Sequence, residues 1–409
     1  MNQLKPAPGY RWVILALLFF SQMALSIGVY GWGPLGPYLK KNLLLTNIQI
    51  GSLTSTLYLS SVICGIPSGI CTDRWGVKIN LVICMMLMGF ALIFAGFAHS
   101  YWFLIIMLAF AGASYGMINP LASKGLNIWF DTGLRATAFG IRQMGVTAGG
   151  AVAGILVIYL AQLKNWSFAV IVAGALAAVI GIISLVFYKE FPANRGRSAI
   201  SANSSSKKMG LLDLLQNRNL LLTYLIMMLL CLGQSCICTF FVLYLKEYLQ
   251  FPALSAGSFF TIIMISGGIG RVFWGLLSDK LFKSRRLPVM KIICIGATIS
   301  ALASFSWKPG WAPFLFIFVA ICFGLSYLGF QGIAVVLMVE LCGSELAGRS
   351  TGLGVTVAWM GMVLGPVIFG TALFSGYPFA WLLVSITSLA SIFLCYALNE
   401  PESGRLESS

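Results

Sequence analysis

The chain has 409 residues, of which 59% are hydrophobic and only 9% are charged, and its mean hydropathy is +0.92. A soluble domain carries about 25% charged residues, so this composition excludes an ordinary soluble enzyme and favours a membrane protein. The 26 Lys and Arg residues outnumber the 11 Asp and Glu residues, for a formal net charge of +15.

Apolar runs predict an all-α integral membrane protein with twelve spanning helices. A span needs about 20 apolar residues, whereas a barrel strand alternates over about ten residues, and the runs here are long and unalternating. The first run is also too long for a removable signal sequence. We place the helices at residues 11–38, 47–70, 80–98, 102–128, 136–161, 167–188, 220–245, 255–278, 288–306, 311–338, 350–374 and 378–397.

The loop cations predict the orientation. With the N-terminus inside, 19 of the 26 Lys and Arg residues fall in inner loops and tails, and only Lys40, Lys41, Lys164, Lys246 and Lys308 fall outside. Such a bias is typical of cytoplasmic loops, so we expect both termini to be cytoplasmic, in a bacterial inner membrane. The net positive charge is then a signal of topology, and nothing else in the sequence indicates a nucleic-acid partner.

One long polar segment divides the chain. Residues 189–219 contain Ser204-Ser205-Ser206 among several basic residues, which is typical of a flexible linker. The sequence therefore predicts a six-helix half at residues 1–188, a cytoplasmic linker at 189–219, a second six-helix half at 220–397 and a cytoplasmic tail at 398–409.

The ten cysteines all lie in apolar stretches and are expected to be buried small hydrophobic residues. The Cys236-x-Cys238 spacing is not that of a usual zinc site. No nucleophile–His–acid set or phosphate-binding loop occurs in the spans, so we expect no enzyme activity, no metal and no cofactor.

The two halves repeat one another. Tyr38-Leu39-Lys40 recurs 206 residues later as Tyr244-Leu245-Lys246, and Gly69-x-x-x-Asp73-Arg74 recurs at the same offset as Gly275-x-x-x-Asp279-Lys280. Two further pairs follow, Gly112-Ala-Ser-Tyr115 with Gly324-Leu-Ser-Tyr327 and Arg135 with Arg349. A duplicated six-helix unit indicates a transporter whose site lies near the membrane midplane, between pseudo-symmetric halves.

The loop motif Gly69-x-x-x-Asp73-Arg74-x-Gly76-x-Lys78 resembles the signature of the major facilitator superfamily, and its second copy lies where that family repeats it. The resemblance covers essentially the whole chain. It implies alternating access by a monomer and a cytoplasmic latch at these loops, in which Asp73 can face a positive helix N-terminus. The alternative role for Arg74 and Lys78 is contact with lipid headgroups. The expected latch residues are Gly69, Asp73, Arg74, Gly76, Lys78, Arg135, Gly275, Asp279, Lys280 and Arg349.

Two arginines fall deep inside predicted spans. Arg271 lies eight residues before Asp279, and Arg142 lies seven residues after Arg135, so each is about 10–12 Å from its inner helix end. No acid or histidine is expected at that depth, and a buried cation is costly unless it faces a cavity or a partner. The missing partner is therefore predicted to be an anionic substrate, which arginine grips through two parallel hydrogen bonds.

Neither arginine belongs to the repeat, since Arg271 corresponds to Gly65 and Arg142 to Thr356. Within the superfamily, the position of Arg271 resembles that of monocarboxylate, oxalate/formate and nitrate porters. Nitrate porters resemble a symmetric version of this arrangement, with a second arginine at the position of Gly65. That arginine is absent here, which favours an organic anion over nitrate. The alternatives are that Arg271 bonds helix carbonyls and that Arg142 packs beside the Gly145-x-x-x-Gly149 groove.

Weaker candidates for substrate contact are polar or aromatic residues within spans, with interhelical hydrogen bonding as their alternative role. They are Tyr115, Tyr327, Asn119, Gln143, Gln234, Gln331 and Trp359. We expect Tyr30 and Trp32 near the outer end to be interfacial belt residues, and Lys124 to extend towards the inner surface.

The sequence thus predicts a secondary transporter of a small organic anion, by proton symport or anion exchange. An exporter of hydrophobic or cationic compounds is the first alternative. The fourth helix lacks the arginine, and the fifth lacks the Gly-Pro groove, that drug-exporting relatives usually carry. A ligand-binding sensor without transport is the second alternative.

Overall fold

The computed structural model describes residues 9–190, 216–311, 313–343 and 346–398, and in these ranges it is helical without strands. Twelve helical segments are long and apolar enough to span a membrane. The elements are α1 (Tyr10–Tyr30), α2 (Trp32–Leu43), α3 (Asn47–Trp75), α4 (Val77–Ala95), α5 (Tyr101–Trp129), α6 (Thr132–Leu163), α7 (Trp166–Phe187), α9 (Arg218–Glu247), α10 (Ala253–Leu281), α11 (Arg286–Ser306), α12 (Pro313–Phe323), the π-helix η2 (Gly324–Leu328), α13 (Gln331–Cys342), α14 (Ala347–Ala372), the 3₁₀-helix η3 (Leu373–Ser375) and α15 (Tyr377–Ala397).

Local sequence explains several helix starts. Thr46 and Gln49 form a reciprocal capping box at α3, and Ser100 accepts a hydrogen bond from the backbone of Phe103 at α5. Asn165 and Asn217 cap α7 and α9 in the same way. These side chains satisfy backbone N–H groups that the first helical turn leaves without a partner.

Two predicted spans differ from the observed helices. The first span extends to Leu43 and is divided at Gly31 into α1 and α2, where the sequence predicted one helix over 11–38. The sequence predicted a span at 311–338, whereas the observed span is Phe314–Cys342. The five-residue π-helix η2 interrupts it. Most of the predicted linker, and the tail after Leu398, lie outside the described residues.

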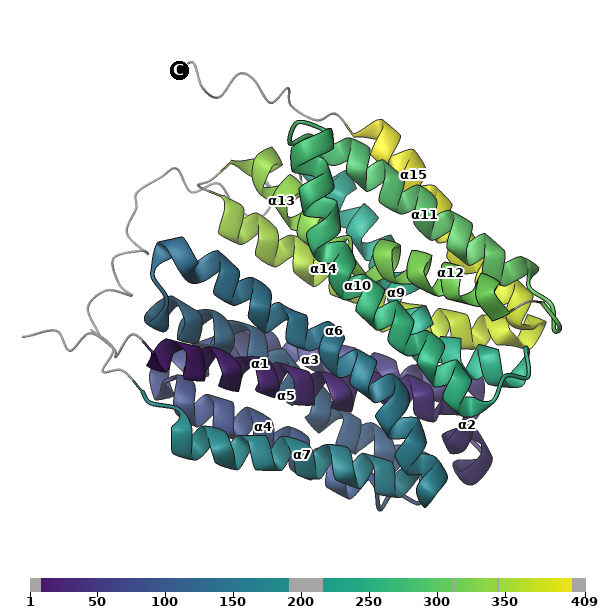
Figure 1. Ribbon diagram of the computed structural model, residues 1–409, viewed down its shortest axis with the longest axis horizontal. Helices are drawn as coiled ribbons and strands as arrows, with labels where there is room; N and C mark the ends of the chain where they lie inside the picture. The colour runs from purple at the N-terminus through teal and green to yellow at the C-terminus, as the bar shows by residue number, and fades with distance from the viewer. Residues whose placement is uncertain (1–8, 191–215, 312, 344–345, 399–409) are drawn as a thin grey trace, which may run out of the picture.

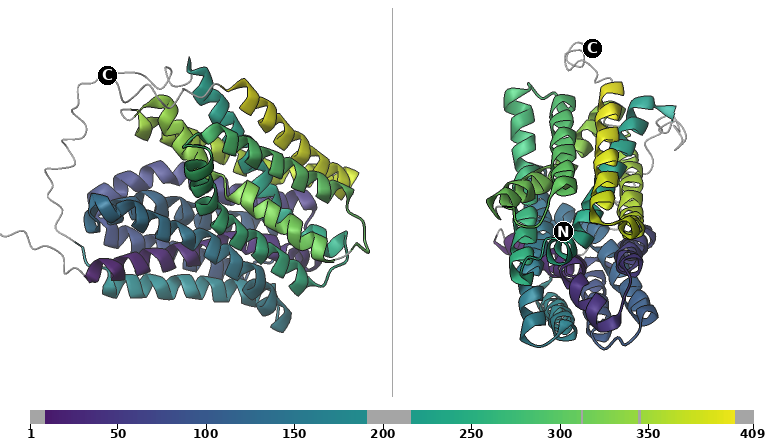
Figure 2. Two further views of the ribbon diagram at one scale, coloured as in Figure 1. Left: turned by 45° about the horizontal axis from the view of Figure 1, so that its top comes forward. Right: turned by 90° about the vertical axis from the view of Figure 1, so that its right-hand side faces the viewer.

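The helices form two bundles that lie against each other, α1–α7 in one and α9–α15 in the other (Figures 1 and 2). Between the bundles, α2 packs on α9, α3 on α14 and α6 on α10. The start of α1 and the end of α7 lie on the same side of the molecule as the start of α9 and the end of α15 (Figures 1 and 2), and we call this side the terminal face. The opposite end, which carries α2, is called the far face.

Glycines hold the corresponding helices together in the two halves. A Cβ at Gly149 of α6 would lie 2.3 Å from the backbone oxygen of Met23 in α1. In α14, a Cβ at Gly361 would lie 2.0 Å from the backbone oxygen of Met228 in α9. Small residues allow this backbone approach in membrane bundles, and the shared device supports the internal repeat.

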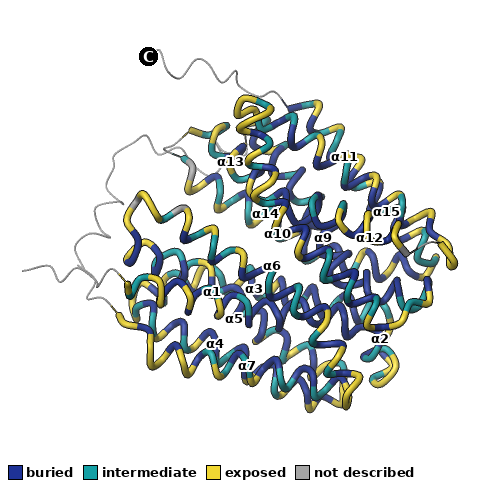
Figure 3. The backbone as a smooth tube through the Cα atoms, viewed as in Figure 1, coloured by how far each residue is buried: buried dark blue, intermediate teal, exposed yellow. Residues whose placement is uncertain are grey.

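Buried residues fill the interior of each bundle, while the outer helix faces are exposed and apolar (Figure 3). Ile66, Trp102 and Phe314 are 76%, 71% and 67% exposed. Such a surface suits a hydrocarbon environment, because lipid covers it without the cost that water would impose. All ten cysteines are free. Six are buried, as expected, whereas Cys64, Cys71, Cys322 and Cys342 are only half-buried.

The halves are in tighter contact towards the far face than towards the terminal face. On α6, a Cβ at Gly154 would lie 2.9 Å from the backbone oxygen of Gly257 in α10, but one at Gly140 would meet nothing within 4 Å. On α14, Gly370 approaches the backbone of Asn47, whereas Gly352 faces open space. The described backbone contacts between the halves are therefore closer towards the far face than towards the terminal face.

Candidate functional site

Arg142 is held on α6 by neutral side chains only. Its side chain is buried, at 3% exposed, and its terminal nitrogens donate to the side-chain oxygens of Gln22, Asn119 (2.9 Å) and Gln143 (3.0 Å). Its Nε is buried without a hydrogen-bond partner in the described part of the chain. Amide oxygens orient the guanidinium group but leave its charge uncompensated.

Arg271 lies on α10 of the other half and reaches across the interface. Its Nε donates to the backbone oxygen of Leu328 at 3.3 Å, and one terminal nitrogen donates to the side-chain oxygen of Gln331 at 3.1 Å. The second terminal nitrogen lies 3.4 Å from the backbone oxygen of Gln143. Gln143 therefore contacts both arginines, through its side chain and its backbone. Two of the three contacts of Arg271 are helix carbonyls, as the alternative role of bonding helix carbonyls requires. These carbonyls are also neutral.

Polar groups beside the arginines reach open space. Asn119, which accepts from Arg142, is exposed on α5, and Thr356, the repeat partner of Arg142, is exposed on α14. Gln331 is half-buried and donates to Gln234 at 3.4 Å. Residues that neighbour the arginines are thus exposed, while Arg142 itself is buried and Arg271 is half-buried.

Aromatic side chains cover the arginines on the side of the far face. Trp359 of α14 stacks on Tyr115 with ring centroids 6.2 Å apart and meets Tyr58 edge-on at 6.3 Å. Tyr115 is close enough to Arg142, Arg271 and Tyr30 to interact with them electrostatically. These four rings, called the aromatic cover, give a bound molecule an apolar surface with hydroxyl groups at its edge.

The described acids have partners elsewhere or stand at helix ends. Asp73 pairs with Lys124, Glu247 with Lys40, and both Asp279 and Glu340 with Arg286. Glu190 accepts from the start of α4, and Asp131 precedes α6. In the described ranges, no carboxylate contacts Arg142 or Arg271, and no group of acids, histidines and cysteines is suited to hold a metal.

The structure brings most of the predicted substrate residues together but not Tyr327. Arg142, Arg271, Tyr115, Asn119, Gln143, Gln331 and Trp359 meet at the interface, and Gln234 contacts this group through Gln331. Tyr327 is 0% exposed inside the second bundle, where its hydroxyl bonds Ser388 and the backbone oxygen of Ala297. Tyr327 therefore makes interhelical hydrogen bonds, the alternative role given for these residues.

Sequence reasoning missed three residues of this site. Gln22 is 1% exposed and binds Arg142 directly, although its place in an apolar run was a visible signal. Tyr58 was not singled out. Tyr30, predicted as an interfacial belt residue, is 5% exposed and lies in the aromatic cover, because the first span continues past it to Leu43 and Tyr30 is not at its outer end. Trp32, predicted for the same belt, is 4% exposed.

The predicted latch residues lie at the terminal face, and their partners differ from expectation. Asp73 accepts a hydrogen bond from Lys124 Nζ at 2.9 Å. Lys124, expected to extend to the surface, is held by Asp73 and by the backbone oxygen of Thr72. The N-terminus of α4 receives Glu190 instead, which accepts from the backbone N–H groups of Val77 (2.8 Å) and Lys78 (2.7 Å).

The remaining latch residues stay within their own halves or at the surface. Arg135 donates to the backbone oxygen of Phe130, while Arg74 and Lys280 are exposed. Gly69 approaches Pro120 at ordinary distance, and a Cβ at Gly275 would meet nothing within 4 Å. Gly76 has φ +86° and packs against Glu190, so its backbone conformation and its space both require glycine. Arg349 lies at the start of α14. A latch role for this set stays a prediction.

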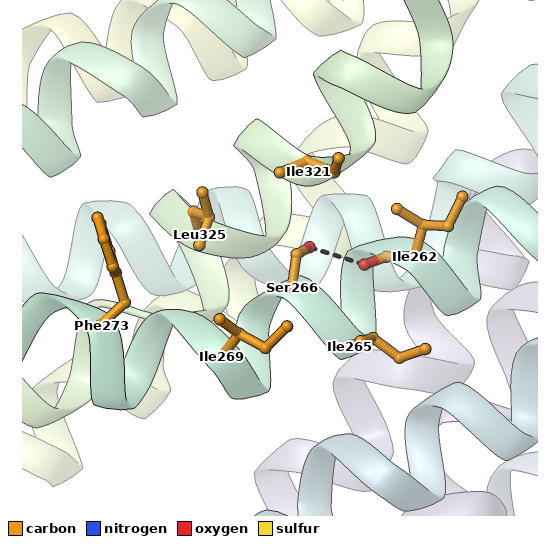
Figure 4. Close-up of a pocket in the computed structure, with 7 residues that line it drawn as sticks. All are labelled: Ile262, Ile265, Ser266, Ile269, Phe273, Ile321 and Leu325. Carbon is orange, nitrogen blue, oxygen red and sulfur yellow. Dashed lines mark hydrogen bonds between the residues drawn. The ribbon is translucent and has the colours of Figure 1, made fainter. Parts of the chain in front are cut away.

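A separate groove of about 400 Å³ lies between α10, α12 and η2 (Figure 4). Six of its seven lining residues are Ile, Phe or Leu, and the hydroxyl of the seventh, Ser266, is bonded back to the backbone oxygen of Ile262 at 2.7 Å. The groove therefore offers no free polar group, and it is distinct from the arginine site.

Twelve spanning helices in two repeated bundles, around a shared polar site, define a carrier architecture. The sequence profile of the Major Facilitator Superfamily matches residues 18–366. The chain belongs to this superfamily, and its function is that of a transporter rather than an enzyme.

Similar proteins include several that are named for anions. The chain is 23% identical to a D-galactonate transporter of Escherichia coli O6:H1, with 96% of this chain and 95% of that protein covered. It is 24% identical to a probable sulfoacetate transporter, SauU, of Cupriavidus necator, with 88% and 87% covered. It is also 24% identical to the membrane sensor protein UhpC of Escherichia coli K12, with 86% and 82% covered.

Among solved structures, a bacterial homolog of the human lysosomal transporter Spinster, in an inward-facing and occupied conformation, is similar with a TM-score of 0.79. The two chains are 14% identical over 95% of this chain and 96% of the other. At this identity the likeness confirms the fold alone.

Proposed function

We propose that this protein moves a small organic anion, with a carboxylate as the anionic group, across the bacterial inner membrane by alternating access. Arg271 is the main anchor of the anion and Arg142 the second. The two halves rock about the bound substrate, with the loops of Asp73 and Asp279 closing the cytoplasmic side. Both termini are cytoplasmic, so the terminal face is the inner side, and the protein works as a monomer in the lipid bilayer.

The observation that carries this proposal is a site with two cations and no acid in the described structure. Arg142 and Arg271 are on different halves, both contact Gln143, and all their partners are neutral. Bringing two like charges together away from water is unfavourable. A carboxylate offsets that cost, and its two oxygens match the parallel donors of a guanidinium group.

The same charge argument favours anion exchange over proton symport. Closure of the empty site would enclose two uncompensated cations, whereas closure around an anion reduces the enclosed charge. The change between inward-facing and outward-facing states should therefore be faster, in both directions, when an anion is bound. Proton symport would need a titratable group in the site or a proton carried on the substrate, and the described site offers no carboxylate or histidine for this purpose.

The aromatic cover suggests how the rest of the substrate lies. With the carboxylate on the arginines, the carbon body faces Trp359 and Tyr115, which offer an apolar surface with a hydroxyl group beside it. D-Galactonate, a hexuronate, sulfoacetate and a hexose phosphate, for which similar proteins are named, form a suitable first panel of substrates.

Counterflow in proteoliposomes tests the proposal. Vesicles loaded with one unlabelled member of the panel should accumulate the same labelled anion, while a neutral sugar and a cationic dye should give no counterflow. Accumulation of the cation but of no anion would instead establish the exporter of hydrophobic or cationic compounds.

The similarity to a membrane sensor protein favours one second candidate, a receptor that binds its ligand without moving it. The same experiment separates the two. A receptor would be stabilised by the anion in a thermal-shift assay and would show no counterflow of that anion.

A further inference from the structure

The repeated motif noted in the sequence meets itself across the two halves at the far face. Tyr38-Leu39-Lys40-Lys41 lies near the end of α2, and its second copy, Tyr244-Leu245-Lys246-Glu247, closes α9. The copies differ in charge at one position, where Lys41 of the first half is replaced by Glu247 in the second. That difference turns two basic segments, which would repel each other, into an attractive pair.

The contacts between the copies are specific. Lys40 Nζ lies 2.8 Å from Glu247 Oε2, with both side chains about one-third exposed. Lys246 Nζ lies 4.7 Å from the centre of the Tyr38 ring, in the range of a cation–π contact. Each copy thus supplies a lysine to the other half, one to a carboxylate and one to an aromatic face.

The second half holds Glu247 in place. The hydroxyl of Tyr377 in α15 donates to Glu247 Oε2 at 2.9 Å. Tyr377 packs against Tyr244 and Tyr248, with centroids 5.4 Å and 5.8 Å away, and the hydroxyl of Tyr244 donates to the backbone oxygen of Ser304. The carboxylate is therefore positioned by its own bundle, and Lys40 is the part that arrives from the other one.

We propose that Lys40, Glu247, Tyr377, Lys246 and Tyr38 form the outer gate of the transport cycle, here called the far-face latch. Beneath it, α2 and α9 meet so closely that a Cβ at Gly33 would lie 1.9 Å from the backbone oxygen of Cys238. The latch is closed in this structure, in which Gly140 of α6 and Gly352 of α14, nearer the terminal face, would meet nothing within 4 Å with a Cβ added. Opening the far face separates α2 from α9 and breaks the ion pair.

The strength of the latch suits a gate. Half-exposed ion pairs contribute modestly, because water screens them and because long side chains lose freedom on pairing. The pair therefore biases the resting carrier towards the closed far face without locking it. This inference depends on alternating access and is independent of which substrate the arginines bind.

Cys238 provides a native reporter. It is 4% exposed and lies on α9 where α2 of the other half approaches most closely, beneath the latch. Purified protein is treated with a small hydrophilic maleimide, and modification of Cys238 itself is followed by peptide mass spectrometry, so the other cysteines do not interfere. No substrate is added.

We expect Glu247→Gln and Lys40→Gln each to speed modification of Cys238 about two- to fivefold, as loss of one half-exposed ion pair allows. Tyr377→Phe should have a smaller effect. The double exchange Lys40→Glu with Glu247→Lys should return the rate to that of the wild type. Lys41→Gln is the matched control and should change nothing, because Lys41 takes no part in the pair.

Wild-type rates in Glu247→Gln, or failure of the double exchange to slow the reaction, would overturn the proposal. Each variant is first checked for a single symmetric gel-filtration peak, and Tyr377→Phe keeps both charges if a charge variant does not fold. Because the assay contains no anion, a failure here is distinguishable from a failure of the proposed transport function.

Discussion

Removing the guanidinium group of Arg271 is the perturbation that bears most directly on the proposed site. In Arg271→Ala, Leu328, Gln331 and the backbone of Gln143 lose their contact with the group, and the site loses one of its two positive charges. Each of these partners is a neutral acceptor, so no buried charge is left without a partner by the change. We therefore expect the protein to fold and transport of the anion to fail.

The expected size of the effect follows from the lost contact. A hydrogen bond to a charged group contributes about 1.5–3 kcal/mol, and each 1.4 kcal/mol is tenfold in affinity. Arg271→Ala should thus weaken apparent substrate affinity about 10- to 100-fold. Arg271→Lys keeps the charge but loses the paired geometry of the guanidinium group, so its loss should be intermediate, about tenfold.

Uptake of labelled anion into proteoliposomes, at a range of concentrations, measures this directly. Lys308→Ala is the matched control, because it removes an exposed cation from a loop at the far face. Thermal unfolding of each variant without substrate separates loss of binding from loss of folding. Wild-type affinity and rate in Arg271→Ala would refute the assignment of this residue as the anchor.

Three further changes test other parts of the structure. Trp359→Ala should raise the KM of an anion with a long carbon body several-fold and barely affect that of a two-carbon acid. Trp359→Phe should restore most of the lost affinity. Equal effects on both acids in uptake assays would count against the aromatic cover. Gly33→Ala should slow transport at least tenfold, because its Cβ would lie 1.9 Å from a backbone oxygen of α9, whereas Gly36→Ala has 3.8 Å of room and should be nearly silent in the same assay. Glu190→Ala should lower the free energy of unfolding by about 1 kcal/mol, because α4 loses its charged cap. The side chain of Asp131 makes no cap bond to α6, so Asp131→Ala should lower it less. The reverse order in thermal unfolding would contradict this role of Glu190.

The fold was predictable from composition and pattern because the bilayer leaves few choices. Backbone groups in hydrocarbon must be satisfied within helices, so apolar runs of sufficient length identify spans, and the repeat identifies the two halves. The length of the first span was less visible. Gly and Pro near the end of a span do not indicate whether the helix stops there or continues as α2.

The arginine pair was predictable for a related reason, since a deep cation without an acid stands out in any apolar run. The direction of each side chain was not. Tyr115 and Asn119 are one turn apart on the regular helix α5, and both reach the site. Their counterparts Tyr327 and Gln331 are separated by the end of η2, whose wider turn rotates Tyr327 into the bundle while Gln331 faces Arg271. Sequence spacing alone does not reveal a π-turn.

Partners at the terminal face were the other gap. The motif predicted that Asp73 takes part in electrostatic contacts there, but its lysine is 51 residues away, and the carboxylate on α4 comes from Glu190, 113 residues after Val77. Contacts at this separation depend on how helices pack, which a single sequence does not specify.

The central claim is that an acid-free pair of arginines selects an anion. Thermal unfolding of the purified protein tests this claim most directly. D-Galactonate is compared with its neutral alcohol, galactitol, at equal concentration, and the other panel acids are compared with their neutral counterparts in parallel. A ligand that binds the folded state raises the unfolding temperature by mass action. The account predicts stabilisation by at least one acid, none by its neutral counterpart, and loss of the effect in Arg271→Gln. Equal stabilisation by an acid and its neutral counterpart, or stabilisation that persists in Arg271→Gln, would contradict it.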